Sequence, residues 1–138
     1  MSPEQLLGSV DFPEEDVVVA DFEAGVGTLT RLGEEHVDTV VIVVEATPKS
    51  IEVGVRAAGL ASERTVARIV VVANRIRHDD DLQVVKNAFP GIEVVGVPHD
   101  PKIVEADRKG VAPIDLDPDA PAVRALVGLA STLLPHSN

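Results

Sequence analysis

The sequence predicts an α/β fold in which a mainly parallel, four-stranded sheet lies between two layers of helices, a three-layer sandwich. Four short apolar runs are continuous rather than alternating, which is typical of strands buried on both faces of a parallel sheet. Helical patterns separate most of these runs, as right-handed β-α-β crossovers require. The length of 138 residues favours one domain with a substantial core.

The expected elements alternate along the chain. Ser2, Pro3 and Gln5 fit a capping box with proline at the first helical position, so we expect a short opening helix. The four expected strands cover residues 17–20, 40–44, 69–73 and 94–97. Residues 22–39, anchored by Leu29 and Leu32, are long enough for a helix between the first two strands.

Signals at their ends define the later helices. A helix over residues 48–62 follows a cap at Thr47, and its expected inner face comprises Ile51, Val55, Ala58 and Ser62. A helix over residues 79–89 begins with three aspartates, which the helix dipole favours. A helix over residues 101–109 ends at Gly110. The last helix, residues 120–134, carries an apolar stripe made of Val123, Leu126, Val127, Ala130, Leu133 and Leu134.

Composition narrows the class of function. No apolar run approaches the roughly 20 residues that cross a bilayer, so we expect a cytoplasmic protein without membrane insertion. The net charge is −11 and no cluster of Lys or Arg occurs, which argues against nucleic acid as a partner. The absence of cysteine excludes disulfides, thiolate catalysis and cysteine-ligated zinc.

Polar residues follow each expected strand at its carboxyl end, where open parallel sheets bind ligands. They are Asp21, Glu23 and Gly25 after the first strand, Glu45 and Thr47 after the second, Asn74 and Arg75 after the third, and Pro98, His99 and Asp100 after the fourth. Turns favour the same residue types for backbone reasons, so a ligand site and ordinary turn chemistry both stay open. We expect no metal site, since His78 has no second histidine near it in the sequence.

Four patches, in this order, resemble the CooC-type ATPases within the MinD/ParA group of deviant-Walker P-loop proteins. They are DFEAG at residues 21–25, VVEATPKS at 43–50, VVANR at 71–75, and VPHD at 97–100 with EAD at 105–107. The resemblance covers most of the chain and corresponds to the C-terminal half of the family. It implies a Rossmann-like, P-loop-NTPase-like half-domain. It also implies that Asp21 matches the residue that reaches magnesium and the catalytic water, that Asn74 matches the asparagine that binds adenine, and that residues 98–100 lie beside the base.

The chain departs from this family in one respect, because no G-x-x-x-x-G-K-[ST] motif occurs in the sequence. That loop binds the phosphates through backbone N–H groups and a lysine. We therefore expect residues 1–138 to be a single truncated domain with no catalytic residue. ATP or ADP with magnesium is expected only through a partner. The candidates for a degenerate nucleotide site are Asp21, Glu23, Gly25, Asn74, Arg75, Pro98 and Asp100.

Two functions remain after this departure. The first is a non-catalytic binding or regulatory protein that forms a homodimer, or a heterodimer with a full-length family ATPase. The alternative is a split ATPase whose partner chain supplies the phosphate loop. A phospho-receiver-like domain is a third class, but its pattern fits poorly because the third strand ends in Asn74. In the family, the strand before the phosphate loop lies between the first two strands found here, so these either pair directly or accept a strand from another chain.

Overall fold

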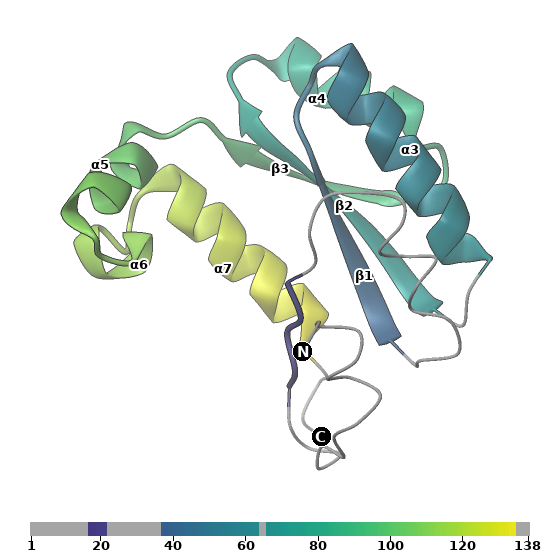
Figure 1. The fold of residues 1–138 in the computed structure, drawn as a ribbon. Coiled ribbons are helices and arrows are strands. Elements are labelled where there is room, and N and C mark those ends of the chain that lie inside the picture. The colour runs from purple at the N-terminus through teal and green to yellow at the C-terminus, as the bar shows by residue number, and fades with distance from the viewer. Residues whose placement is uncertain (1–16, 22–36, 64–65, 135–138) are drawn as a thin grey trace.

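The computed structural model describes residues 17–21, 37–63 and 66–134 (Figure 1). Its strands are β1 (Val37–Val44), β2 (Val66–Ile76) and β3 (Glu93–Pro98). They form one sheet in the order β1-β2-β3, and both pairings are parallel. Three of the four predicted strands are therefore confirmed.

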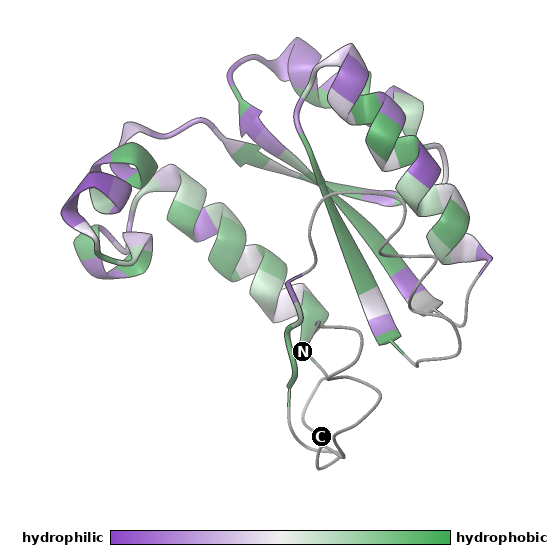
Figure 2. Ribbon diagram, viewed as in Figure 1, coloured by the Kyte–Doolittle hydropathy of each residue, from purple (hydrophilic) through white to green (hydrophobic). Residues whose placement is uncertain are grey.

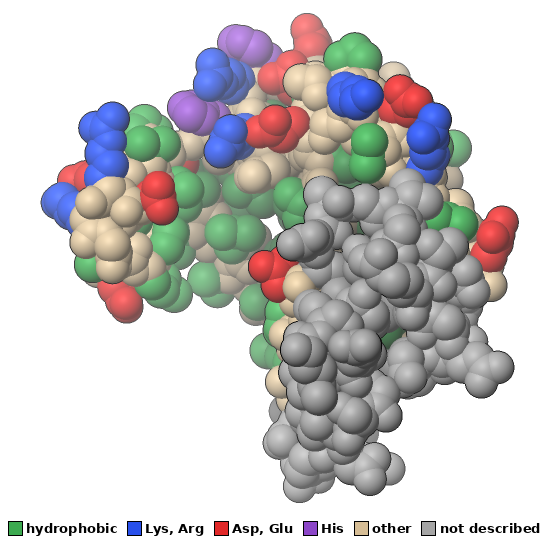
Figure 3. Space-filling model, in the orientation of Figure 1, with side chains coloured by type: hydrophobic (Ala, Val, Ile, Leu, Met, Phe, Trp, Pro, Cys, Tyr) green, Lys and Arg blue, Asp and Glu red, His purple; other side chains and the backbone are tan. Residues whose placement is uncertain are grey.

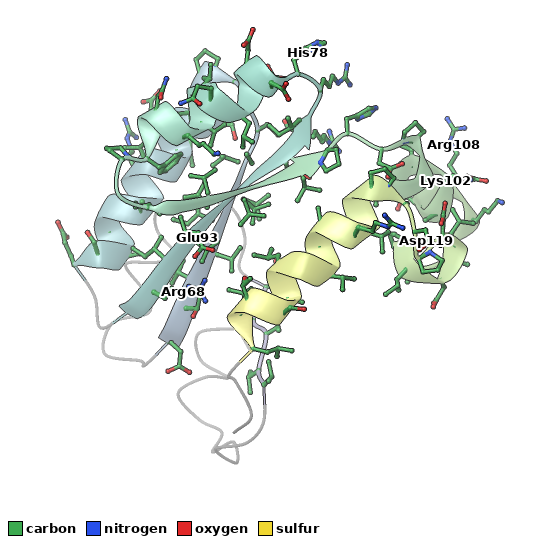
Figure 4. All side chains as sticks on the ribbon, turned by 180° about the vertical axis from the view of Figure 1, so that it is seen from behind. Arg68, His78, Glu93, Lys102, Arg108 and Asp119 are labelled. Atoms are coloured by element: carbon green, nitrogen blue, oxygen red, sulfur yellow. The ribbon has the colours of Figure 1, made fainter. Side chains whose placement is uncertain are left out.

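The prediction of a fourth strand at residues 17–20 is wrong, because the sheet of the described residues has three strands. The side chains of Val17, Val18 and Val19 are 59%, 43% and 88% exposed. An apolar run becomes a buried strand only when a neighbouring strand binds its backbone and helices cover its faces. Within the described ranges this segment has no strand partner, and in Figures 1 and 4 it runs past the C-terminal end of α7.

The helices begin and end close to the predicted positions. They are α3 (Pro48–Ser62), α4 (Asp79–Ala88), α5 (Pro101–Lys109), α6 (Pro113–Leu116) and α7 (Pro121–Leu133). The short α6 was not predicted. The opening helix and the helix expected after residue 22 lie outside the described residues. No helix in the described part of the chain is long and apolar enough to cross a membrane.

Helices cover both faces of the sheet (Figure 1). On one face, Ile42, Val44 and Val71 pack with residues of α3 and α4, including Ala58 and Val85. On the other face, Val70, Val72 and Val97 pack with Ala122 and Leu129 of α7. Successive residues of β2 alternate between the two clusters, as the pleat of a strand requires.

The predicted buried face of α3 is confirmed for Ala58 and for Ile51, which packs against the core, and is wrong for Val55 and Ser62. The structure buries Gly54, Ala58 and Ala61, whereas Val55 is 43% exposed. A Cβ added at Gly54 would overlap Val44 Cγ1 and would lie 3.1 Å from Phe89 Cζ. The helix therefore packs on β1 through small residues, at a distance that larger residues would prevent.

The apolar stripe predicted for α7 is also only partly buried. Val123 is buried as predicted, but Leu126, Val127 and Leu134 are 43%, 48% and 47% exposed. The face of α7 that packs on the sheet is formed by Ala122, Ala125 and Leu129, which the stripe omitted, and by Leu133, which it included. The helix has two apolar faces (Figure 2), and sequence periodicity cannot tell which of them meets the sheet.

One arginine ties α7 to the amino-terminal end of the sheet (Figure 4). The Nη2 atom of Arg68, in β2, lies 2.6 Å from the Oε2 atom of Glu93, in β3. The Nη1 atom of Arg68 donates to the backbone oxygen of Thr132 at 2.8 Å. These contacts join both strands to the last turn of α7. The opposite end of the sheet, at the carboxyl ends of the strands, carries the candidate site.

Candidate functional site

The carboxyl ends of the three strands meet at one edge of the sheet because the strands are parallel. Glu45 directly follows β1, Asn74 and Arg75 lie near the end of β2, and Pro98 ends β3. The structure thus brings together the candidates that the sequence placed after these three strands. We call this region the carboxyl edge.

Of the candidates after the first expected strand, the structure describes Asp21 alone. Asp21 is exposed, and its segment lies beside the C-terminal end of α7 in both views of the ribbon (Figures 1 and 4). Glu23 and Gly25 lie outside the described residues. Their proposed part in a nucleotide site stays a prediction.

Strand β2 is irregular at the carboxyl edge. Its pairing with β3 shifts register between Ala73 and Ile76, so Asn74 and Arg75 form a bulge. Arg75 has a φ of 56°, in the left-handed region that residues with a Cβ avoid. Such a conformation costs on the order of 1 to 3 kcal/mol and is often found at functional sites. Beyond the bulge, the ladder resumes where the His99 N–H donates to the Ile76 oxygen at 2.9 Å.

Arg75 forms an ion pair with Glu45 across the ends of β2 and β1. The distance from Arg75 Nη1 to Glu45 Oε1 is 3.2 Å, and the two side chains are 69% and 44% exposed. The backbone of Glu45 is fixed because its N–H donates to Ser50 Oγ of α3 at 2.9 Å. A pair this exposed contributes at most about 1 kcal/mol to stability, so the pair mainly orients Arg75.

Asn74 lies in the bulge of β2 at the carboxyl edge. The residue is half-buried in the bulge, and its side chain forms no hydrogen bond to another described residue. An amide offers both a donor and an acceptor, which suits the polar edge of a base. The role that the resemblance implies for Asn74 therefore fits this position and stays a prediction.

Asp100 has a structural role at the same edge. The residue is 7% exposed and caps α5, with Oδ1 accepting from the Lys102 N–H at 3.0 Å. Its Oδ2 accepts from the Ala122 N–H, at the start of α7, also at 3.0 Å. These two backbone hydrogen bonds, first that of Ala122 and then that of Lys102, lower the pKa of the carboxyl group. Both oxygens are thus engaged by helix N-termini, which stabilise the anion.

The surface over the carboxyl edge carries charges of both signs. Figure 3 shows His, Lys and Arg side chains there together with Asp and Glu side chains. Arg77 and His78 are exposed there, and their backbone N–H groups donate to Asp81 Oδ2 at 3.3 Å and 3.2 Å. Across the described ranges, no group of three or more His, Cys, Asp or Glu residues is placed to hold a metal ion. Whether ATP or ADP with magnesium binds here stays a prediction.

Two curated proteins resemble the chain over most of its length. It is 32% identical over 120 residues to an ATP-binding protein of Methanocaldococcus jannaschii, a match covering 84% of this chain and 46% of the relative. It is 29% identical over 114 residues to CooC, the carbon monoxide dehydrogenase accessory protein of Rhodospirillum rubrum, covering 82% of this chain and 43% of CooC. The chain spans less than half the length of these relatives. No protein-family model matches it.

Solved structures with the same fold come from cell division proteins. The MinD cell division protein of Aquifex aeolicus superposes with a TM-score of 0.59 at 26% identity, over 79% of this chain and 48% of that one. A chain of the MinC:MinD complex from the same organism gives a TM-score of 0.52 at 28% identity, over 73% of this chain and 44% of that one. The similarity again covers most of this chain and about half of the other.

Proposed function

Since the chain is a partial relative of the CooC and MinD group of ATPases, we propose that it acts by contact with another polypeptide and does not hydrolyse ATP alone. One observation carries the proposal: the chain keeps the strand ends of a nucleotide-binding fold, while its sequence contains no phosphate-binding loop. Without the backbone N–H groups and the lysine of that loop, a triphosphate would be held only weakly. The protein is then a binding or regulatory partner, in a homodimer or with a full-length ATPase.

Binding of nucleotide by the purified chain tests this proposal directly. Titration calorimetry with ATP and magnesium should give no binding tighter than micromolar, because the described carboxyl edge offers a base contact without a phosphate site. Sub-micromolar binding would contradict the proposal. So would release of phosphate that disappears in the Asp21→Ala variant.

A second function, a split ATPase, is favoured by the state of the carboxyl edge. The Asn74 amide has no partner among the described residues, and the strained backbone of Arg75 persists although its exposed ion pair adds little stability. A retained ligand contact would account for both. In this case the partner chain supplies the phosphate loop, and Asn74 contributes to binding the base.

Hydrolysis by a mixture distinguishes the two functions. A split ATPase should release phosphate only when both chains are present, and Asn74→Ala should raise KM more than it lowers kcat. Asn87→Ala on the exposed face of α4 is the matched control and should leave both constants unchanged. A mixture that binds tightly without hydrolysis supports the regulatory function.

A further inference from the structure

The layer of helices on the α7 side of the sheet stops short of β1. Val41 and Val43 of β1 pair directly with Val70 and Val72 of β2 and point to the same face. Val70 and Val72 are 0% and 4% exposed, whereas Val41 and Val43 are 39% and 62% exposed. The cover supplied by α7, which packs against β3, therefore ends between β2 and β1.

The exposed apolar face of α7 borders the same region. At about 100° per residue, Leu126 lies about 55° round the helix from the middle of the face that packs on the sheet, whereas Val127 lies about 155° from it, nearly opposite that face. Figure 3 shows hydrophobic side chains over α7 on the side turned toward β1. Two apolar surfaces, one on a strand and one on a helix, thus meet at one corner of the molecule.

The spacing of the elements leaves room for one helix. Neighbouring strands lie about 4.8 Å apart, so β1 and β3 are separated by roughly 10 Å. Packed helices lie about 8 to 10 Å apart. A helix packed beside α7 would therefore lie over β1 and would cover Val41, Val43 and Leu126 together.

Among the described residues, nothing pairs with the outer edge of β1. Within the described ranges β1 pairs only with β2. Its sequence, VDTVVIVV, contains no Lys, Arg or Pro, the residues that commonly prevent an edge strand from pairing. The edge is therefore suited to adding a strand.

A second copy of this chain could pair with the outer edge of β1 but would not cover the apolar face beside it. Two copies that paired through their β1 edges would each keep α7 over their own β3, roughly 14 Å beyond the neighbouring β1. Val41 and Val43 would stay uncovered. A strand followed by a helix, in contrast, would fill the edge and the helix position at once.

We propose that Val41, Val43, Leu126 and the outer edge of β1 form a docking surface for a strand-helix unit of a separate chain. That unit is the half of the fold that this chain does not span, since the matches cover 46% and 43% of the two curated relatives. The inference rests on the proposed function, and it specifies the form of the partner and the surface that receives it.

Single-cysteine labelling tests the surface, because the chain contains no cysteine of its own. The variants are Val43→Cys and, as a matched control, Val84→Cys on α4, whose native side chain is 50% exposed. The probe is the part of the Methanocaldococcus relative outside the 120 matched residues, co-expressed with the full chain as a separate polypeptide. We expect the two chains to co-purify, with labelling of Val43→Cys slowed about tenfold or more, an effect of at least about 1.4 kcal/mol, and no change for Val84→Cys.

A further substitution and the chain alone complete the test. Val41→Lys should abolish co-purification, because it places a charge in the buried part of the contact. Protection of Val43→Cys that grows with concentration of the chain alone would assign the surface to a second copy and overturn the proposal. Protection of Val43→Cys at every dilution of the chain alone would assign the surface to the chain's own remaining residues and would also overturn the proposal. Co-expression that leaves Val43→Cys unprotected would overturn it as well. None of these outcomes depends on ATP hydrolysis, which tests the proposed function separately.

Discussion

Replacing Gly54 by Ala in α3 tests how closely this helix packs on the sheet. An added Cβ would overlap Val44 Cγ1, and Val44 is only 2% exposed and has a stiff, β-branched side chain. Overpacking of this kind costs about 1 to 3 kcal/mol. Replacing glycine within a helix returns about 0.5 to 1 kcal/mol. The steric cost is the larger, so we expect a net loss of about 1 to 2 kcal/mol.

Gly59 in the same helix is the matched control. A Cβ there would meet no atom within 4 Å, so Gly59→Ala should gain about 0.5 to 1 kcal/mol from helix propensity alone. The propensity gain is common to both variants, and the difference between them isolates the overlap with Val44. With a urea m-value of about 2 kcal/mol/M, their midpoints should differ by about 1 M. Equal midpoints, or a Gly54→Ala variant more stable than the wild type, would refute the packing described here.

Two further predictions concern the carboxyl edge. Asp100→Asn should lower stability near neutral pH. The difference from the wild type should shrink as pH falls below the ordinary carboxyl pKa of 3.8 and should be lost below the lowered pKa of the folded state. The reason is that a carboxyl group with a lowered pKa in the folded state stabilises the protein only while it is ionised. Urea midpoints of both proteins, measured against pH, check this prediction. A difference in midpoint that persists in acid would contradict it. Arg75→Gly should raise the free energy of unfolding by up to about 1 kcal/mol, and the urea midpoint with it, because glycine relieves the backbone at φ 56°. Arg75→Ala should not raise it, because alanine keeps a Cβ. A lower midpoint for the glycine variant would show that the backbone is not strained.

The sequence predicted the elements whose ends carry local signals. The Thr47 side chain accepts from the Ser50 N–H at 3.3 Å, and Pro48 starts α3 as expected. Gly110 closes α5 in the left-handed conformation, as expected. These signals act within a few residues, so the sequence alone was sufficient to place them.

The errors concern contacts between distant parts of the chain. Residues 17–20 have the composition of a strand, but a strand also needs a neighbour, which local sequence does not specify. Both faces of α7 are apolar, and only the position of β3 determines that Leu129, and not Leu126, is buried. Within the site, the individual residues of the strand ends were predictable, but the pairing of Arg75 with Glu45 depends on the bulge in β2.

The bond between Asp100 and Ala122 joins two points separated by 22 positions in the chain. Between them, α5 and α6 contact each other and extend to one side of the sheet (Figure 1). Because the Asp100 carboxylate joins the two ends of this segment, the length of the segment can change without moving β3 or α7. Insertions and deletions during evolution should therefore accumulate between these two positions, and a tag or sensor inserted there would leave the sheet intact.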